Sequence, residues 1–167
     1  MQITVDMVKE LRARTGAGVM DAKKALDDTK GDLAKAEELL AKKGLASAAK
    51  KSGRETSQGL VEAYIHSGNR VGAIVEVNCE TDFVARTEDF RNLARNLAMQ
   101  IAAMSPNYVD RPSLPADAGD VSDDKLLLDQ AYIRDPGKTV RDVITEVIAR
   151  TGENIRVRRF SRFSLGE

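Results

Sequence analysis

Few residues in this chain could do covalent chemistry. It contains one histidine, His66, and one cysteine, Cys79, so a triad of nucleophile, base and acid would have to depend on His66. A histidine at the end of a hairpin strand is more often an ordinary surface residue, and a cysteine on an apolar strand is usually a small buried side chain. Without a second cysteine there is no internal disulfide, which suits a reducing compartment. We therefore predict no catalytic residue and no metal-ligand cluster.

The glycines do not form a phosphate-binding loop. Gly16-Ala17-Gly18 joins two predicted helices instead of following a strand, so it lacks the context of a dinucleotide fingerprint. The sequence also has no Gly-Lys-Ser/Thr phosphate loop. We expect neither a cofactor nor direct nucleotide binding.

The segment Asn78–Ala85 carries the clearest binding feature. It reads Asn-Cys-Glu-Thr-Asp-Phe-Val-Ala and places an acid, Asp82, beside a large aromatic, Phe83, where a predicted strand gives way to a helix. In one interpretation Asp82 or Thr87 caps the helix and Phe83 is buried in the core. In the other, the acid and the aromatic contact a partner. The local residues leave both interpretations open.

The elements that position this segment form a predicted hairpin and helix. Strands over 60–66 and 71–79 are joined by Ser67-Gly68-Asn69-Arg70, whose turn residues favour a β-hairpin. From about Thr87 onward, apolar residues recur at spacings of three and four, as on one face of a helix. These residues are Phe90, Leu93, Leu97, Ile101 and Met104.

The remainder of this part of the chain is less regular. Three prolines between residues 105 and 123 favour an irregular excursion, with a brief strand at 107–109. A helix is predicted over 125–133, and a final helix ends near Gly152 before a last strand over 155–163. The order of elements predicts an α+β fold in which a small antiparallel sheet has helices on one side.

The first 44 residues predict three short helices. Thr4 or Asp6 can cap the first helix, and Gly16-Ala17-Gly18 ends it. The third helix begins at Asp32 and stops at Gly44, which is placed as a C-terminal glycine. Strong helix formers after Gly44 favour a fourth, looser helix.

The helical part suits a compact module of the ubiquitin-associated type. We place this N-terminal helical module at residues 1–51. A polar linker rich in Ser and Gly follows at 52–59. The α+β core domain occupies 60–167.

Composition limits the partners that we expect. The 26 basic side chains balance 26 acidic ones, so no net field attracts a polyanion such as nucleic acid. The apolar runs are shorter than the roughly 20 residues of a membrane span, and the N-terminus lacks the blocks of a signal peptide. We predict a cytoplasmic protein that binds neither membrane nor nucleic acid.

One basic strip offers an alternative. Four arginines and two phenylalanines lie on the last predicted strand: Arg156, Arg158, Arg159, Arg162, Phe160 and Phe163. They are explained either as a solvated strand that protects a sheet edge or as an RNA-binding strip. An RNA-binding accessory protein is therefore the rival hypothesis.

Three motifs together resemble one family. Glu76–Ala85 is similar to the signature of the bacterial elongation factor Ts family, the guanine nucleotide exchange factors of elongation factor Tu. Val8–Arg12 with Thr15–Leu26 resembles the opening helical domain of that family, and Gly152–Phe160 resembles its closing strand. The resemblance runs nearly from end to end in the order of the family.

The resemblance implies a function and a set of site residues. It implies that Thr81–Val84 inserts beside the magnesium site of elongation factor Tu, where Phe83 wedges into an apolar pocket. Asp82 would then disturb the polar groups that hold the metal, while Thr81 and Val84 fix the geometry of the segment. It also places Val19 and Met20 at the docking contact of the helical module, unless both are core residues.

The chain departs from the longer members of this family. Those members have a duplicated core subdomain and an inserted coiled-coil hairpin, whereas only one core subdomain fits here. Short members can use a second copy of themselves instead. We therefore expect a possible homodimer, with the sheet edge near the last strand as one candidate interface.

Overall fold

A computed structural model describes residues 2–167 of the chain. The chain divides into two compact units. The first contains the residues up to Gly53 together with Thr145–Glu153, and the second contains Arg54–Ile144 together with Asn154–Glu167. Helix α6 (Val140–Thr151) contributes to both units.

Three helices build most of the first unit: α1 (Val5–Thr15), α2 (Val19–Asp28) and α3 (Leu33–Lys51). Of the two predicted caps of α1, Thr4 is the one that forms, and its hydroxyl accepts a hydrogen bond from the Met7 amide at 3.2 Å. Asp32 caps α3 as predicted. The helices enclose a small core of fully buried side chains: Leu11, Ala22, Ala25, Leu26 and Ala36.

Helix α3 does not stop at Gly44, so that prediction was wrong. The helix continues to Lys51 without a separate fourth helix. Gly44 is buried inside it, and a Cβ there would lie 3.8 Å from Thr145 and Ala149 of α6, an ordinary contact distance. The helix formers that follow outweigh the cost of about 1 kcal/mol that one glycine imposes.

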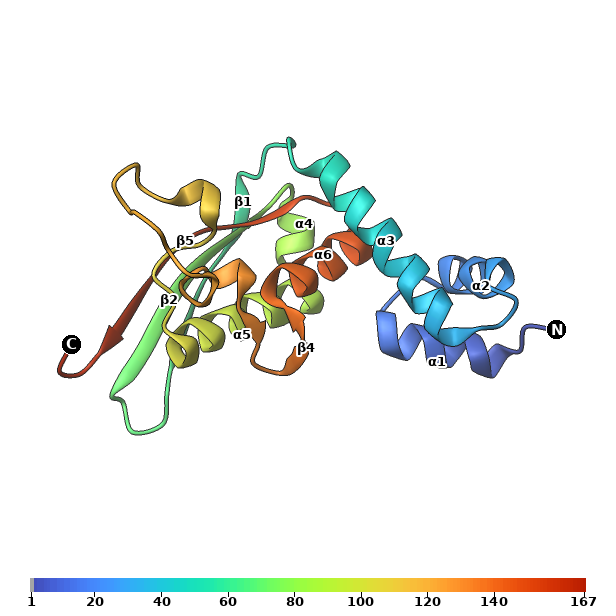
Figure 1. Cartoon of the computed structure of the whole chain (residues 1–167), viewed down its shortest axis with the longest axis horizontal. Helices are drawn as coiled ribbons and strands as arrows, with labels where there is room; N and C mark the ends of the chain where they lie inside the picture. The colour runs from blue at the N-terminus through green and yellow to red at the C-terminus, as the bar shows by residue number, and fades with distance from the viewer. Residues whose placement is uncertain (1) are drawn as a thin grey trace. The chain divides into compact units, whose positions relative to one another are not determined.

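The second unit is built on a three-stranded antiparallel sheet (Figure 1). Its strands are β1 (Gln58–Ile65), β2 (Val71–Cys79) and β5 (Ile155–Ser164), and their order is β1-β2-β5. Strand β1 begins two residues before the predicted Leu60. Helix α5 (Glu88–Met104) and the short α4 (Asp82–Ala85) pack against this sheet.

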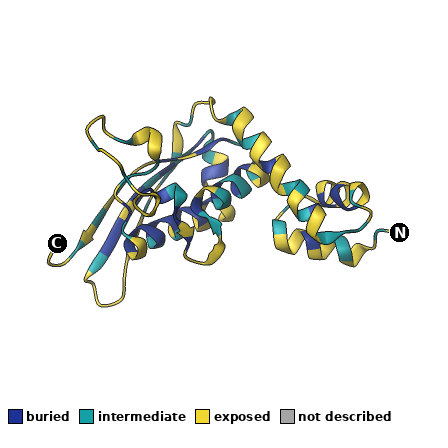
Figure 2. Cartoon of the chain, viewed as in Figure 1, coloured by how far each residue is buried: buried dark blue, intermediate teal, exposed yellow. Residues whose placement is uncertain are grey.

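The helix-covered face of the sheet holds the core of the second unit. Four of the five predicted apolar positions of α5 are buried, namely Phe90, Leu93, Leu97 and Ile101, and Met104 is more exposed. They share this core with β2 and β5, whose inward residues include Val75, Val77 and Val157. Figure 2 shows buried residues concentrated along α5 and along the strands that it covers. The predicted α+β class, with helices on one side of an antiparallel sheet, is confirmed.

The opposite face of the sheet carries exposed apolar side chains. We call Val61, Ile65, Ile74 and Phe163 the open-face patch; all four are exposed. Ile65, Gly72 and Phe163 are register partners across the three strands. A Cβ at Gly72 would lie 2.5 Å from Cδ1 of Ile65, so the glycine leaves room for that side chain to lie across the sheet.

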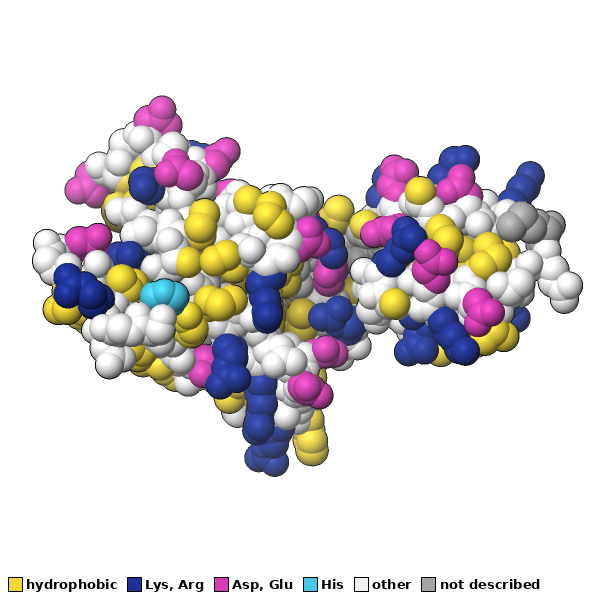
Figure 3. All heavy atoms as spheres, turned by 90° about the horizontal axis from the view of Figure 1, so that it is seen from below, with side chains coloured by type: hydrophobic (Ala, Val, Ile, Leu, Met, Phe, Trp, Pro, Cys, Tyr) yellow, Lys and Arg dark blue, Asp and Glu magenta, His cyan; other side chains and the backbone are white. Residues whose placement is uncertain are grey.

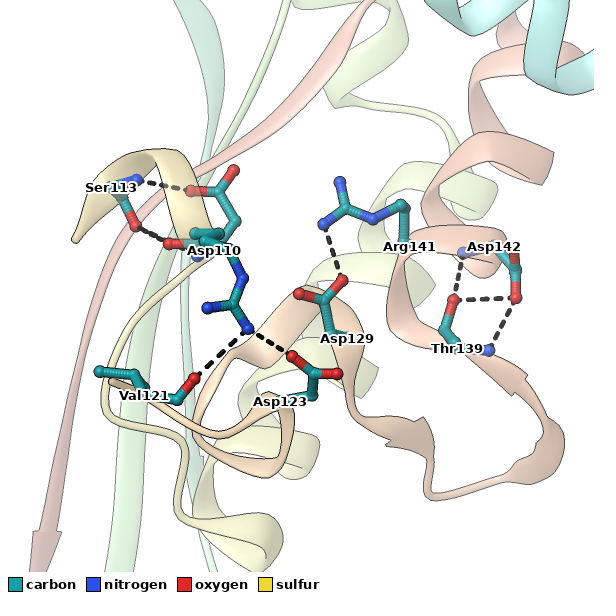
Figure 4. Close-up of polar contacts among 9 residues, drawn as sticks. Asp110, Ser113, Val121, Asp123, Asp129, Thr139, Arg141 and Asp142 are labelled. Carbon is teal, nitrogen blue, oxygen red and sulfur yellow. Dashed lines mark hydrogen bonds and ion pairs between the residues drawn. The ribbon is translucent and has the colours of Figure 1, made fainter. Parts of the chain in front are cut away.

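The irregular segment after α5, residues 105–123, is ordered by hydrogen bonds and an ion pair. Tyr108 forms a parallel bridge with Leu126, where a brief strand was predicted over 107–109. Asp110 caps a single 3-10 turn through Ser113, and Arg111 pairs with Asp123 (Figure 4). These contacts order a segment whose prolines prevent regular structure.

The helix predicted over 125–133 is absent. Two 3-10 turns, Asp123–Lys125 and Leu127–Asp129, are followed by the small strands β3 (Ala131–Tyr132) and β4 (Asp135–Thr139). The amides of Leu127 and Leu128 donate to carbonyls of Tyr108 and Val109 instead of to their own turn. Tertiary hydrogen bonds therefore overrode the local helix preference.

Candidate functional site

The Asp82-Phe83 pair lies on a short helix between β2 and α5. Thr81 caps α4, and its hydroxyl accepts the Val84 amide at 3.3 Å. Thr87 caps α5 by accepting the Phe90 amide at 3.3 Å. Thr87 is therefore a cap, as one interpretation predicted, whereas Asp82 occupies the first turn of α4 and is not its cap.

Phe83 points into solvent. Phe83 is 77% exposed, whereas its neighbours Val84 and Ala85 are buried and only 9% and 5% exposed. Exposing a large aromatic forgoes roughly 1.5–3 kcal/mol of burial free energy. The interpretation of Phe83 as a core residue was wrong, because Val84 and Ala85 are the residues that anchor this turn.

Asp82 is held by a contact that is easy to replace. Its Oδ2 lies 2.9 Å from Nη2 of Arg86, one helical turn away; the Arg86 side chain is exposed and that of Asp82 is about half exposed. Exposed pairs at this spacing contribute only about 0.3–0.5 kcal/mol to stability. Asp82 can exchange Arg86 for a partner group at little cost.

The backbone on both sides of the pair is fixed. The buried thiol of Cys79 donates to the Thr81 carbonyl at 3.1 Å. The Thr87 hydroxyl donates to the Val84 carbonyl at 2.7 Å. Hydrogen bonds therefore hold the turn at both ends, and it presents an acid and an aromatic between them.

Val19 and Met20 are exposed on the first unit, at 52% and 76%. They open α2 directly after Gly18, while later residues of that helix face the core. Arg12 Nε donates to the Ala17 carbonyl at 3.1 Å and so holds the turn that presents them. The alternative that Val19 and Met20 are core residues was wrong.

The two residues considered for chemistry, His66 and Cys79, lie at opposite ends of the β1–β2 hairpin. In residues 2–167, no group of three His, Cys, Asp or Glu side chains could hold a metal ion, and no helix could cross a membrane. His66 lies at the hairpin end with its Nδ1 3.0 Å from the Tyr64 hydroxyl. The lone histidine, cyan in Figure 3, lies at the surface beside hydrophobic side chains.

Two arginines of the predicted basic strip on β5 make hydrogen bonds within the protein. Arg159 Nε bonds to Glu76 at 2.8 Å, and this bond, with one from Asn78, holds the pKa of the Glu76 carboxyl below its ordinary value. Arg162 donates to the Ala102 carbonyl and is largely buried. Two of the four arginines are thus engaged within the protein.

Each unit presents exposed apolar side chains beside a hydrogen-bonded turn, an arrangement typical of surfaces that bind other molecules. Comparison with known proteins specifies the family. A family model described as elongation factor Ts matches residues 46–122. The chain is 48% identical to elongation factor Ts of Carboxydothermus hydrogenoformans, covering 99% of this chain and 90% of that protein. It is 47% identical to that of Herpetosiphon aurantiacus, covering 99% of each.

This chain belongs to the elongation factor Ts family, as the resemblance implied. The protein is therefore related to translation elongation factors. The alignments extend over 195 and 196 positions, whereas the chain has 167 residues. These relatives therefore contain residues that have no counterpart here.

Proposed function

We propose that the protein is a guanine nucleotide exchange factor that binds elongation factor Tu–GDP and promotes release of GDP, so that GTP can rebind. The observation that carries this proposal is the exposed Phe83 beside Asp82 on an anchored turn. Membership of the elongation factor Ts family supports it.

The mechanism acts on the magnesium and phosphate site of the partner. A GTPase binds GDP through Mg²⁺, its phosphate-binding loop and a lysine, so a protein that disturbs those contacts lowers the affinity for GDP. Phe83 would wedge into an apolar pocket beside that site. Asp82 would exchange Arg86 for the polar groups that hold the metal. Thr81 and Val84 would keep the wedge in position through the cap and the buried anchor.

No bond is made or broken in this mechanism. Coupling between two ligands is reciprocal, so the factor by which this protein weakens GDP binding is also the factor by which GDP weakens binding of this protein. Each can therefore displace the other. The protein would act catalytically without being an enzyme, and it would need no cofactor.

Val19 and Met20 would provide the docking contact on the nucleotide domain of elongation factor Tu. Both are apolar, exposed and held by an ordered turn. Two contacts on one chain raise the effective concentration of the wedge once the module has docked.

A second copy of the chain would take the place of the second core subdomain of longer relatives. The open-face patch supports this proposal because it is apolar and all four of its side chains are exposed in the single chain. It includes Phe163 of β5, the strand near which the interface was predicted. A two-fold dimer would bring this patch against its own copy.

The test is release of a fluorescent GDP from elongation factor Tu, with the wild type and with Phe83→Ala. We expect the wild type to accelerate release and the variant to lose most of that acceleration without loss of stability, because Phe83 contributes little to the core. Met104→Ala is the matched control, since it removes another exposed apolar side chain at the far end of α5.

Two results would contradict the proposal. No acceleration by the wild type would remove the exchange function and return attention to RNA, whose binding would weaken steeply with salt. Full activity of Phe83→Ala would remove the wedge while leaving the exchange function in place.

A further inference from the structure

Three segments that are far apart in the sequence meet at Glu80, three residues before Phe83, the proposed wedge. Glu80 Oε1 accepts the backbone amide of Asn154 at 2.6 Å and lies 3.4 Å from Nη1 of Arg54. Asn154 Nδ2 in turn donates to the Arg54 carbonyl at 2.9 Å. The three residues form a closed network in which Asn154 is only 3% exposed.

The network lies at one end of the sheet. Glu80 follows the last residue of β2 and precedes Thr81, the cap of α4. Asn154 precedes Ile155, which opens β5 and is the register partner of Cys79. Arg54 belongs to the segment that leads into β1. The Glu80 carboxylate therefore joins the end of β2 to the start of β5. Glu80 is also the residue directly before the cap of α4, the helix that carries Phe83.

From this geometry we propose that Glu80 is a positioning residue for Phe83. The inference depends on the proposed exchange function and names a residue through which the wedge is oriented. A functional side chain must be held within about 0.5 Å of its productive position by the residues that support it. Thr81, one residue away, has its own backbone and hydroxyl engaged in holding α4, so a movement of residue 80 is passed directly to the short helix.

Two substitutions of Glu80 distinguish the role of its negative charge from the role of its hydrogen-bond acceptor. Charge-assisted hydrogen bonds are shorter and stronger than neutral ones, which agrees with the short contact to Asn154. Glutamine keeps one oxygen acceptor, loses the negative charge and replaces the second oxygen with an NH2 donor. Alanine removes the acceptor, so the backbone amide of the buried Asn154 loses its hydrogen bond to residue 80.

Glu76 provides a matched control on the same strand. Its carboxylate also pairs with an arginine, Arg159, and its side chain is 23% exposed against 22% for Glu80. Glu76 contacts neither α4 nor Asn154 in any described hydrogen bond. Glu76→Ala therefore removes an equivalent carboxylate without disturbing the network.

The experiment measures GDP release from elongation factor Tu as a function of the concentration of Glu80→Ala, Glu80→Gln and Glu76→Ala. A misplaced reactive group commonly costs up to about 100-fold in rate, so we expect Glu80→Ala to lower the maximal release rate roughly tenfold. The half-saturating concentration should change little, because Val19 and Met20 are intact. Glu80→Gln and Glu76→Ala should stay close to the wild type.

Hydrogen exchange of the Val84 amide gives a second readout. That amide donates to Thr81, so its exchange should become faster in Glu80→Ala and remain slow in Glu80→Gln. This measurement needs no partner protein, and the amides of the buried residues of α5 report in the same experiment whether each variant is folded.

Three results would overturn the assignment of Glu80. They are a wild-type release rate in Glu80→Ala, an equal loss in Glu76→Ala, and unchanged protection of Val84 in Glu80→Ala. If the wild type accelerates release and Phe83→Ala does not, these results reject only the positioning role of Glu80, and the proposed exchange function is unaffected. Failure of the wild type itself would instead remove the proposed function.

Discussion

At the scale of single residues, burial separates the side chains that hold the site from those that can act. Val84 and Ala85 are buried, whereas Phe83 between Asp82 and Val84 is exposed. A helix of one turn directs neighbouring side chains outward in different directions, so anchoring two of them leaves another free. The exposed aromatic is thus a consequence of how its neighbours pack.

Met20 provides a test of the docking contact. We expect Met20→Ala to weaken binding to elongation factor Tu by roughly tenfold, since an exposed apolar anchor typically contributes 1–2 kcal/mol to an interface. Stability should change by less than about 0.5 kcal/mol, because the side chain is exposed. Affinity can be measured by titration calorimetry.

The control for this test is Val5→Ala. Val5 is a second exposed apolar residue of the helical module, on α1 instead of α2. A wild-type affinity in Met20→Ala, or an equal loss in Val5→Ala, would remove Met20 from the docking contact.

At the scale of elements, the hairpin depends on one close backbone approach. Gly59 in β1 has a φ of 147°, and a Cβ there would lie 2.0 Å from the Val77 carbonyl oxygen of the neighbouring strand. Only a residue without a side chain fits this distance. The register of β1 and β2, and with it the end of β2 that leads to the wedge, therefore requires glycine at this position.

We expect Gly59→Ala to lower the free energy of unfolding by roughly 1–3 kcal/mol, the usual cost of forcing extra volume into a packed site. Urea unfolding followed by circular dichroism measures it. Gly68→Ala is the matched control, because Gly68 also has a positive φ but a Cβ there would meet nothing within 4 Å. Equal losses in the two variants would show that backbone strain, and not the close approach, limits residue 59.

At the scale of the whole molecule, the open-face patch leaves apolar surface in solvent. Its four members lie on the same face of all three strands, and each forgoes the free energy of burial. Contiguous exposed apolar surface of this kind commonly marks an interaction site. A second copy of the chain would cover it.

Phe163→Glu tests this dimer. A two-fold interface would place the new charge against its own copy, so we expect a wild-type dimer to become a monomer in the variant. Sedimentation equilibrium at micromolar concentration measures the change. The side chain is 74% exposed in the single chain, so the folded monomer should keep its stability. A wild type that sediments as a monomer would exclude the homodimer.

Much of the fold could be predicted from the sequence because it depends on neighbouring residues. The Thr87 cap, the hairpin turn and the apolar face of α5 each involve groups within a few positions of one another. The wrong predictions at Gly44 and at residues 125–133 have a common cause. In both places, a local signal was outweighed: by the helix formers that follow Gly44, and by hydrogen bonds to the distant residues Tyr108 and Val109.

The sequence alone determined which residues form the Asp82-Phe83 segment and which family it resembles, because those depend on residue types in order. Only the tertiary structure decided that Phe83 is exposed, since its burial depends on which side of α4 packs against the core, and Val84 and Ala85 occupy that side. The same holds for Glu80. Its acceptor role depends on Asn154, which lies 74 residues further along the chain and comes within reach only when β5 pairs with β2.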